Sequence, residues 1–99
     1  MEQQTKVGMV DWKRAMVLTE ASAAVADLRC CYRLLVTMNE KEQTSFLIAI
    51  ESEGEEAVES VGAELERAIG WFERIVWGKV TPCGLHDVLE DFWQTESIG

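Results

Sequence analysis

Residues 18–35 read LTEASAAVADLRCCYRLL, with apolar side chains that recur every three or four positions. Residues 58–75 read VESVGAELERAIGWFERI and keep the same spacing over the same length. That spacing aligns apolar side chains along one face of an α-helix. The two stretches therefore predict two long helices, each with one stripe to bury. The stripes comprise Leu18, Ala21, Val25, Leu28, Tyr32 and Leu35 in the first stretch, and Val58, Val61, Leu65, Ala68, Phe72 and Ile75 in the second.

The expected limits of the two helices follow from their flanking residues. No glycine or proline occurs between Met9 and Glu53, and the carboxylate of Asp11 is suited to cap a helix N-terminus. We expect the first helix at about 11–38, after a flexible segment at 1–9. Glutamates at the start and Gly78 at the end delimit the second helix at about 55–77.

The two stripes match when they are docked antiparallel. Ala21 then faces Phe72 and Tyr32 faces Val61, so a large side chain meets a smaller one in both layers. This match predicts an antiparallel helical hairpin. Gly62 lies on the flank of the second helix, where it leaves room for a close neighbour, either a second copy of the chain or the last helix.

Two shorter segments complete the predicted fold. The segment at about 40–52 contains an apolar run at 45–50 that suits either a short helix or a buried strand. We favour the helix, because a single strand would have no partner. Thr81 and Pro82 are typical of a helix start, and the apolar spacing that follows predicts a C-terminal helix at about 82–95. The predicted fold class is therefore all-α, with residues 1–99 forming a single helical domain.

The composition limits the classes of ligand. The formal net charge is −9, and residues 51–66 contain seven glutamates and no basic residue. Direct binding to nucleic acid is not expected, because contacts to phosphates require a basic surface. No apolar stretch approaches the roughly 18 residues that a membrane-spanning helix needs, and the N-terminus has no signal-peptide pattern. With three cysteines, two of them adjacent, we expect free thiols and a cytoplasmic protein that does not bind membranes.

No arrangement of residues indicates catalysis. Cys83, His86 and Glu90 share one side of the predicted last helix, but the sequence has no second histidine and no pair of cysteines at metal-binding spacing. A surface histidine near a helix start is a sufficient explanation of this pattern. We therefore expect no enzyme activity, no cofactor and no metal site.

The remaining features favour an interaction protein. A two-helix hairpin cannot cover all the apolar flanks of its helices, and four tryptophans in 99 residues offer anchors for an interface. We expect a small acidic adaptor, regulator or inhibitor that binds another protein with a basic surface and forms a homodimer. The alternative is an acidic inhibitor of a nucleic-acid-binding complex, such as a phage-type antagonist of host defence that mimics nucleic-acid charge. The residues expected to contact the partner are Glu51, Glu53, Glu55, Glu56, Glu59, Trp12 and Trp77.

Overall fold

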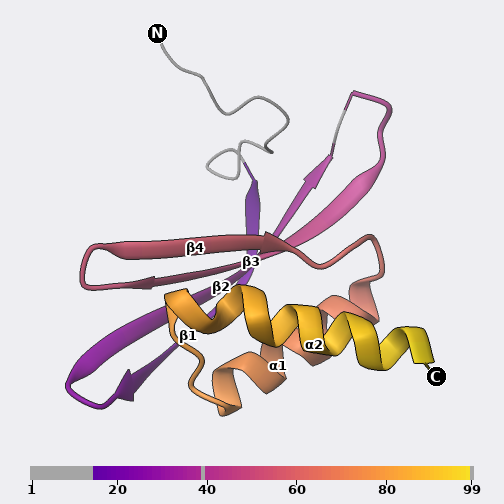
Figure 1. Ribbon diagram of the computed structural model, residues 1–99. Coiled ribbons are helices and arrows are strands. Elements are labelled where there is room, and N and C mark those ends of the chain that lie inside the picture. The colour runs from indigo at the N-terminus through magenta and orange to yellow at the C-terminus, as the bar shows by residue number, and fades with distance from the viewer. Residues whose placement is uncertain (1–14, 39, 99) are drawn as a thin grey trace, which may run out of the picture.

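The computed structural model describes residues 15–38 and 40–98, with side chains as far as Thr95. These residues form an antiparallel sheet of four strands followed by two helices (Figure 1). The strands are β1 (Met16–Val25), β2 (Leu28–Met38), β3 (Thr44–Ser52) and β4 (Glu55–Ser60), and they lie in the sheet in chain order. The helices are α1 (Leu65–Trp77) and α2 (Leu85–Ile98), joined through a 3₁₀ turn, η2 (Pro82–Gly84).

The prediction of an all-α hairpin is wrong. The expected helix at about 11–38 is instead the β1–β2 hairpin, and the segment at about 40–52 is mostly β3. The expected helix at about 55–77 divides into β4 and α1, whereas a C-terminal helix does occur near 82–95, as η2 and α2. The expected layers also differ, because Tyr32 lies in the sheet between Ala21 of β1 and Ile50 of β3. The expected flexible segment at 1–9 and the Asp11 cap lie outside the described residues.

In the β1–β2 hairpin, side chains alternate between the two faces of the sheet. Tyr32 is buried on one face, while the next residue, Arg33, lies on the other and reaches two neighbouring strands. The chain turns at Ala26–Asp27, and Ala26 has a φ of 56°. Tight turns of this kind usually place glycine or asparagine at positive φ. Because alanine takes this position, Asp27 is left as the one turn-favouring residue, and the apolar spacing around it favours one continuous helix.

β3 is the central strand of the core. Its residues 46–50 are buried, which puts apolar side chains on both faces of the sheet. Burial on both faces removes the alternation of polar and apolar residues that identifies a strand. The prediction of a helix here assumed that a strand would have no partner, but β3 is paired on both sides, with β2 and with β4.

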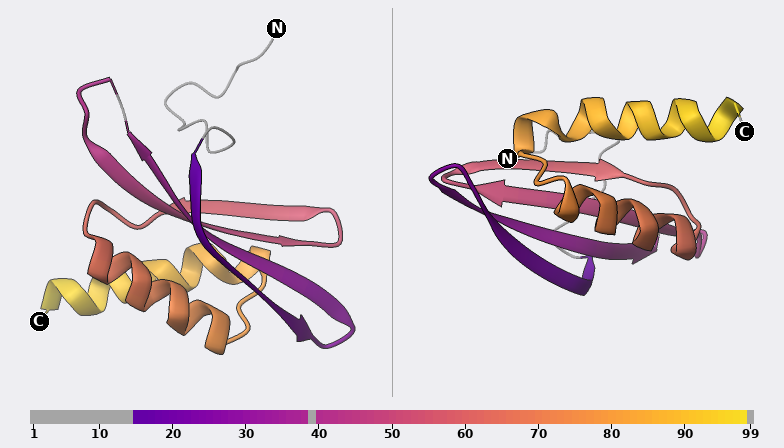
Figure 2. Two further views of the ribbon diagram at one scale, coloured as in Figure 1. Left: turned by 180° about the vertical axis from the view of Figure 1, so that it is seen from behind. Right: turned by 90° about the horizontal axis from the view of Figure 1, so that it is seen from below.

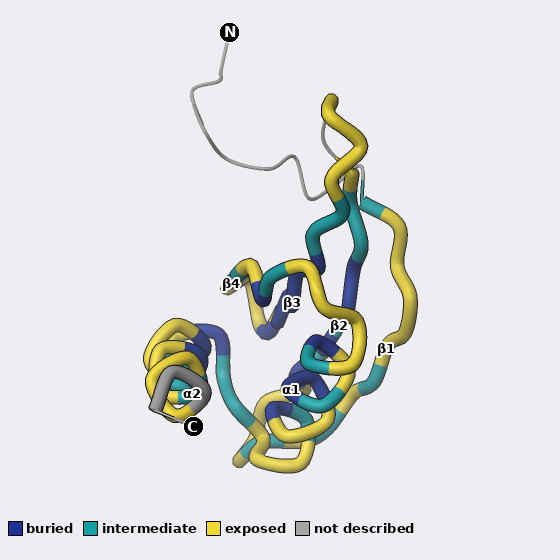
Figure 3. The backbone as a smooth tube through the Cα atoms, turned by 90° about the vertical axis from the view of Figure 1, so that its right-hand side faces the viewer, coloured by how far each residue is buried: buried dark blue, intermediate teal, exposed yellow. Residues whose placement is uncertain are grey.

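Both helices pack on the same face of the sheet (Figures 1 and 2). The second predicted stripe is correct for three of its four residues in α1, because Ala68, Phe72 and Ile75 form part of the buried face, whereas Leu65 is exposed. In Figure 3 the buried parts of the chain gather between the sheet and the helices. This main core comprises Cys30, Tyr32, Leu34, Phe46, Ile48, Ile50, Val61, Ala68, Trp71, Phe72, Ile75, Leu85 and Leu89.

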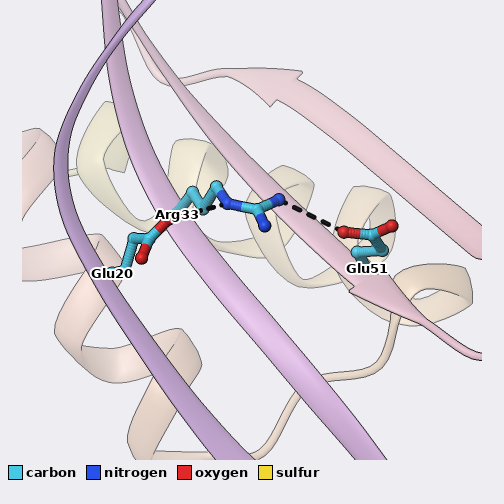
Figure 4. Close-up of polar contacts among 3 residues, drawn as sticks. All are labelled: Glu20, Arg33 and Glu51. Carbon is cyan, nitrogen blue, oxygen red and sulfur yellow. Dashed lines mark hydrogen bonds and ion pairs between the residues drawn. The ribbon is translucent and has the colours of Figure 1, made fainter.

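On the face away from the helices, Arg33 links three strands (Figure 4). Its Nε donates to Glu20 of β1 at 2.9 Å, and a terminal nitrogen donates to Glu51 of β3 at 3.3 Å. These hydrogen bonds, that of Glu20 first, raise the pKa of the Arg33 guanidinium above its usual value. Solvent-exposed ion pairs contribute only about 0–1 kcal/mol each. A smaller apolar cluster also lies outside the main core: Leu35, Leu47, Ala49, Val58 and Ala15.

Tyr32 places a polar group inside the main core. Its hydroxyl is buried and has no hydrogen-bond partner among the described residues. Burial raises the pKa of Tyr32 from the usual value of 10.0 to about 12, and the neighbouring Cys30 thiol adds to the shift. The phenolate is therefore less favourable in the folded chain than in the unfolded chain.

We expect Tyr32→Phe to change how stability depends on pH. Because the pKa of Tyr32 is raised in the folded chain, its contribution to the free energy of unfolding is complete below pH 10. This contribution is lost as the pH rises toward about 12. At pH 11 the native chain should lose about 1.4 kcal/mol of unfolding free energy relative to the Phe variant. Urea unfolding of both chains at neutral pH and at pH 11 measures this difference. Equal losses in the two chains would contradict the assignment.

Candidate binding groove

An open groove lies between the edge strand β4 and the helix α2, with a volume of about 720 Å³. In Figure 3, β4 ends the sheet on the side where α2 lies. One wall is therefore a strand edge and the other is a helix face. β4 contributes Glu59 and Ser60, and α2 contributes residues at helical spacing, namely His86, Leu89, Glu90, Trp93 and Gln94.

β4 and α2 run in the same direction along the groove. Near the start of α2, Nδ1 of His86 lies 3.5 Å from Oε2 of Glu59. Seven residues later, Trp93 lies beside Gly62, just past the end of β4. Three residues of extended chain and seven residues of helix both span about 10 Å. The two walls therefore remain level with each other along this length.

An aromatic cluster holds α2 against α1. The Trp71 ring meets Trp93 edge-on with 4.7 Å between ring centres, and its centre lies 5.5 Å from that of Phe92. The Arg67 guanidinium lies 5.0 Å from the centre of the Trp93 ring, and that of Arg74 lies 4.2 Å from the centre of Phe92. Trp93 nevertheless keeps 36% of its surface exposed, and it lines the groove.

Gly62 allows the chain to leave the sheet where Trp93 packs. The N–H of Val61 donates to the Phe46 carbonyl, and the N–H of Phe46 donates to the Gly62 carbonyl, both at 2.8 Å. Two consecutive residues thus bond to one residue of β3, as in a β-bulge. Gly62 has a φ of 91°, and a Cβ there would lie 3.2 Å from Cη2 of Trp93. Both the backbone conformation and the close approach favour glycine.

The groove is acidic and open to solvent. Glu59 and Glu90 line it from opposite walls, and His86 is the basic residue among its lining. The contact between His86 and Glu59 is an ion pair when the imidazole is protonated, and water screens it, because the side chains are 68% and 36% exposed. Leu89 and Trp93 supply apolar surface. This combination suits a cationic group on an apolar stem.

The five predicted glutamates belong to the β3–β4 hairpin and not to the start of a helix. Glu59 lines the groove. Glu51 and Glu56 lie opposite each other on the two strands, Glu53 is in the turn, and Glu55 begins β4. The hairpin therefore distributes these carboxylates over both faces and the tip, and it brings one of them to the groove.

Of the two predicted tryptophans, the structure describes only Trp77. Trp77 ends α1 and is 85% exposed, but it is not part of the groove lining, and Trp12 lies outside the described residues. Sequence reasoning missed most of the α2 wall. The available signal was the spacing of His86 and Glu90 on one helix side, which becomes informative only once β4 is known to lie beside it.

Metal chemistry has no support in the described part of the chain, where no three His, Cys, Asp or Glu side chains are grouped closely enough to hold an ion. Cys83 lies 3.6 Å from the Thr81 hydroxyl.

Comparison of the chain with protein-family models, with curated proteins and with solved structures found no match. The function must therefore be argued from the groove itself.

A pair of glycine substitutions tests how the groove is built. Gly62→Ala should lower the free energy of unfolding by about 1–3 kcal/mol, because the backbone conformation is strained for alanine and Trp93 is close. Gly70 in α1 is the matched control, since a Cβ there meets nothing within 4 Å. Gly70→Ala should raise stability by up to about 1 kcal/mol. Urea unfolding measures both, and a Gly62→Ala chain as stable as the native one would refute the packing described.

Proposed function

We propose that this chain is a non-enzymatic interaction module that binds a basic segment of another protein in the groove between β4 and α2. The observation that carries the proposal is the lining of the groove, with a carboxylate on each wall beside Leu89 and the partly exposed Trp93. A lysine or arginine side chain would place its charge near the carboxylates and its methylene stem on the apolar surface. An arginine would also stack on an aromatic ring.

Charge and apolar contact have different roles in this proposal. A net charge of −9 attracts basic partners over a distance and raises the rate of encounter. Each exposed charge contact, however, contributes only about 0.2–1 kcal/mol and weakens with salt. Specific binding therefore needs the apolar surface of Leu89 and Trp93 as well, which a small mobile cation would not use.

The proposal includes a cytoplasmic location, supported by the three free cysteines, which fit a reducing compartment. No helix in the described part of the chain has the length and apolar character needed to cross a membrane.

The expected homodimer stays a prediction, although the uncovered helical flanks that motivated it are absent from this fold. Exposed apolar side chains now lie on the other edge strand, β1, at Met16, Val17 and Leu18. A second copy would bury apolar area at that edge.

The acidic inhibitor is a second candidate function. It is favoured by the tip of the β3–β4 hairpin, where Glu51 lies opposite Glu56 and where Glu53 and Glu55 flank Gly54. Closely spaced carboxylates offer a nucleic-acid-binding protein some of the charge that it recognises in phosphates. The two candidates can be separated at the tip, because neutralising Glu51 and Glu53, which lie outside β4 and outside the groove lining, should affect the inhibitor and leave groove binding nearly unchanged.

Binding should depend on the two groove carboxylates. A suitable probe is an acetylated and amidated octapeptide of alternating arginine and threonine, which is basic and favours extended structure. Glu59→Gln combined with Glu90→Gln should weaken its affinity about three- to tenfold, because two exposed charge contacts are lost. Titration calorimetry at low salt, about 50 mM, measures the affinity where screening is limited.

The matched control is Glu66→Gln combined with Glu73→Gln, which removes the same charge from exposed positions of α1 outside the groove. This variant should bind the peptide within about twofold of the native chain, because only long-range attraction changes. Equal losses in the two double variants would show that net charge, and not the groove, attracts the peptide. A native chain that does not bind the peptide would overturn the proposed function.

A further inference from the structure

The geometry points to how the groove takes its partner: we propose that an extended basic segment pairs with the free edge of β4 and becomes a fifth strand of the sheet. This inference rests on the proposed function, because it takes the bound segment to be basic. Strand addition is a recurring mode of recognition, in which main-chain hydrogen bonds supply affinity and alternate side chains supply specificity.

The edge of β4 offers hydrogen-bonding groups that β3 does not use. In an antiparallel pair, residues that exchange bonds with the neighbouring strand alternate with residues whose N–H and C=O groups point away. Phe46 exchanges its bonds with Val61 and Gly62, so the register makes Glu59 and Ala57 the next residues bonded to β3. The residues whose backbone groups point to the free edge are therefore Glu56, Val58 and Ser60.

The groove lies directly beside this edge. Glu59 and Ala57 place their side chains on the face covered by the helices, where Glu59 contacts His86 and Ala57 packs against the main core. An added strand continues the same pleat, so every second side chain would point toward α2. Those side chains would meet Glu59 and Glu90 together with the apolar surface of Trp93.

Charge selects the occupant of this edge. A second copy paired through its own β4 would set Glu55, Glu56 and Glu59 against the same residues, and like charges across strands are destabilising. A basic strand would instead be attracted by the same carboxylates. The opposite edge, β1, carries only one charged residue, Glu20, which is already paired with Arg33. The basic segment is therefore assigned to β4.

Two N-methylated forms of the arginine–threonine octapeptide test the strand. One carries methyl groups on the backbone nitrogens of its threonines, and the other on the backbone nitrogens of its arginines. Each form therefore lacks one set of backbone N–H donors. With arginines pointing into the groove, an antiparallel strand bonds to β4 through its threonine N–H groups and a parallel strand through its arginine N–H groups. We expect one form to bind the native chain at least about tenfold more weakly than the unmodified peptide, and the other to bind nearly as well.

Ser60→Pro tests the same edge from the side of the protein. Proline removes the Ser60 N–H, which β3 does not use, and edge strands accept proline at such positions. The variant should keep its thermal midpoint within a few degrees and lose about fivefold in affinity for the unmodified peptide, as expected for one backbone hydrogen bond. Ser60→Ala lacks the hydroxyl that accepts from the Gly62 N–H at 3.4 Å but keeps its own N–H, so the fivefold loss is expected between Ser60→Ala and Ser60→Pro. If Ser60→Pro fails to fold, the methylated peptides on the native chain decide the question.

The outcomes separate this inference from the proposed function. If the unmodified peptide binds and the two methylated forms change equally, strand addition is overturned while the acidic groove stands. If the unmodified peptide does not bind, the proposed function fails with it. Light scattering tests whether a second copy of the chain occupies the β4 edge instead. A dimer that dissociates in Ser60→Pro would assign this edge to a second copy and overturn the proposal.

Discussion

The fold depends on the burial of residues 46–50, which are apolar on both faces of β3. A strand of this kind is stable only where both of its faces are covered and both of its edges are paired. β2 and β4 pair with its edges, α1 and α2 cover one face, and Leu35 and Val58 pack with the other. Among the described residues β4 is consequently the last strand, and its edge beside α2 pairs with no other strand. The position of the groove therefore follows from the needs of the central strand.

The sequence allowed the segments at 68–77 and 85–95 to be predicted as helix, because their apolar spacing reflects a single buried face. The same reasoning failed at 16–38, where small and apolar residues are so dense that three- and four-residue spacing and alternation both fit. Turn signals would have decided between them. The hairpin turns at Ala26 and at Glu53 place non-glycine residues at positive φ, and Gly54 alone marks the second turn. An unusual choice of turn residues thus concealed two strand boundaries.

The site was less predictable than the fold for a different reason. Its acidic character was evident in the sequence, but a groove requires two walls, and these are residues 59–60 and 86–94. A wrong assignment of β4 as helix removed the strand edge from consideration. The sequence predicts room for a close neighbour at Gly62, either a second copy or the last helix, and Trp93 of the last helix does approach it. That approach was assigned to the flank of a helix, whereas its physical basis is a bulge at the end of a strand.

The two free edges of the sheet avoid pairing with themselves in different ways. β1 has a register shift between Val17 and Thr19, which bends the strand and interrupts its ladder. β4 is short and carries three glutamates among its six residues, a charged edge of the kind that natural sheets use against aggregation. Acidic protection, however, is selective, because it repels another acidic strand and attracts a basic one. The carboxylates that keep two β4 edges apart would therefore also admit a basic segment, so protection of the edge and recognition of a partner require the same residues.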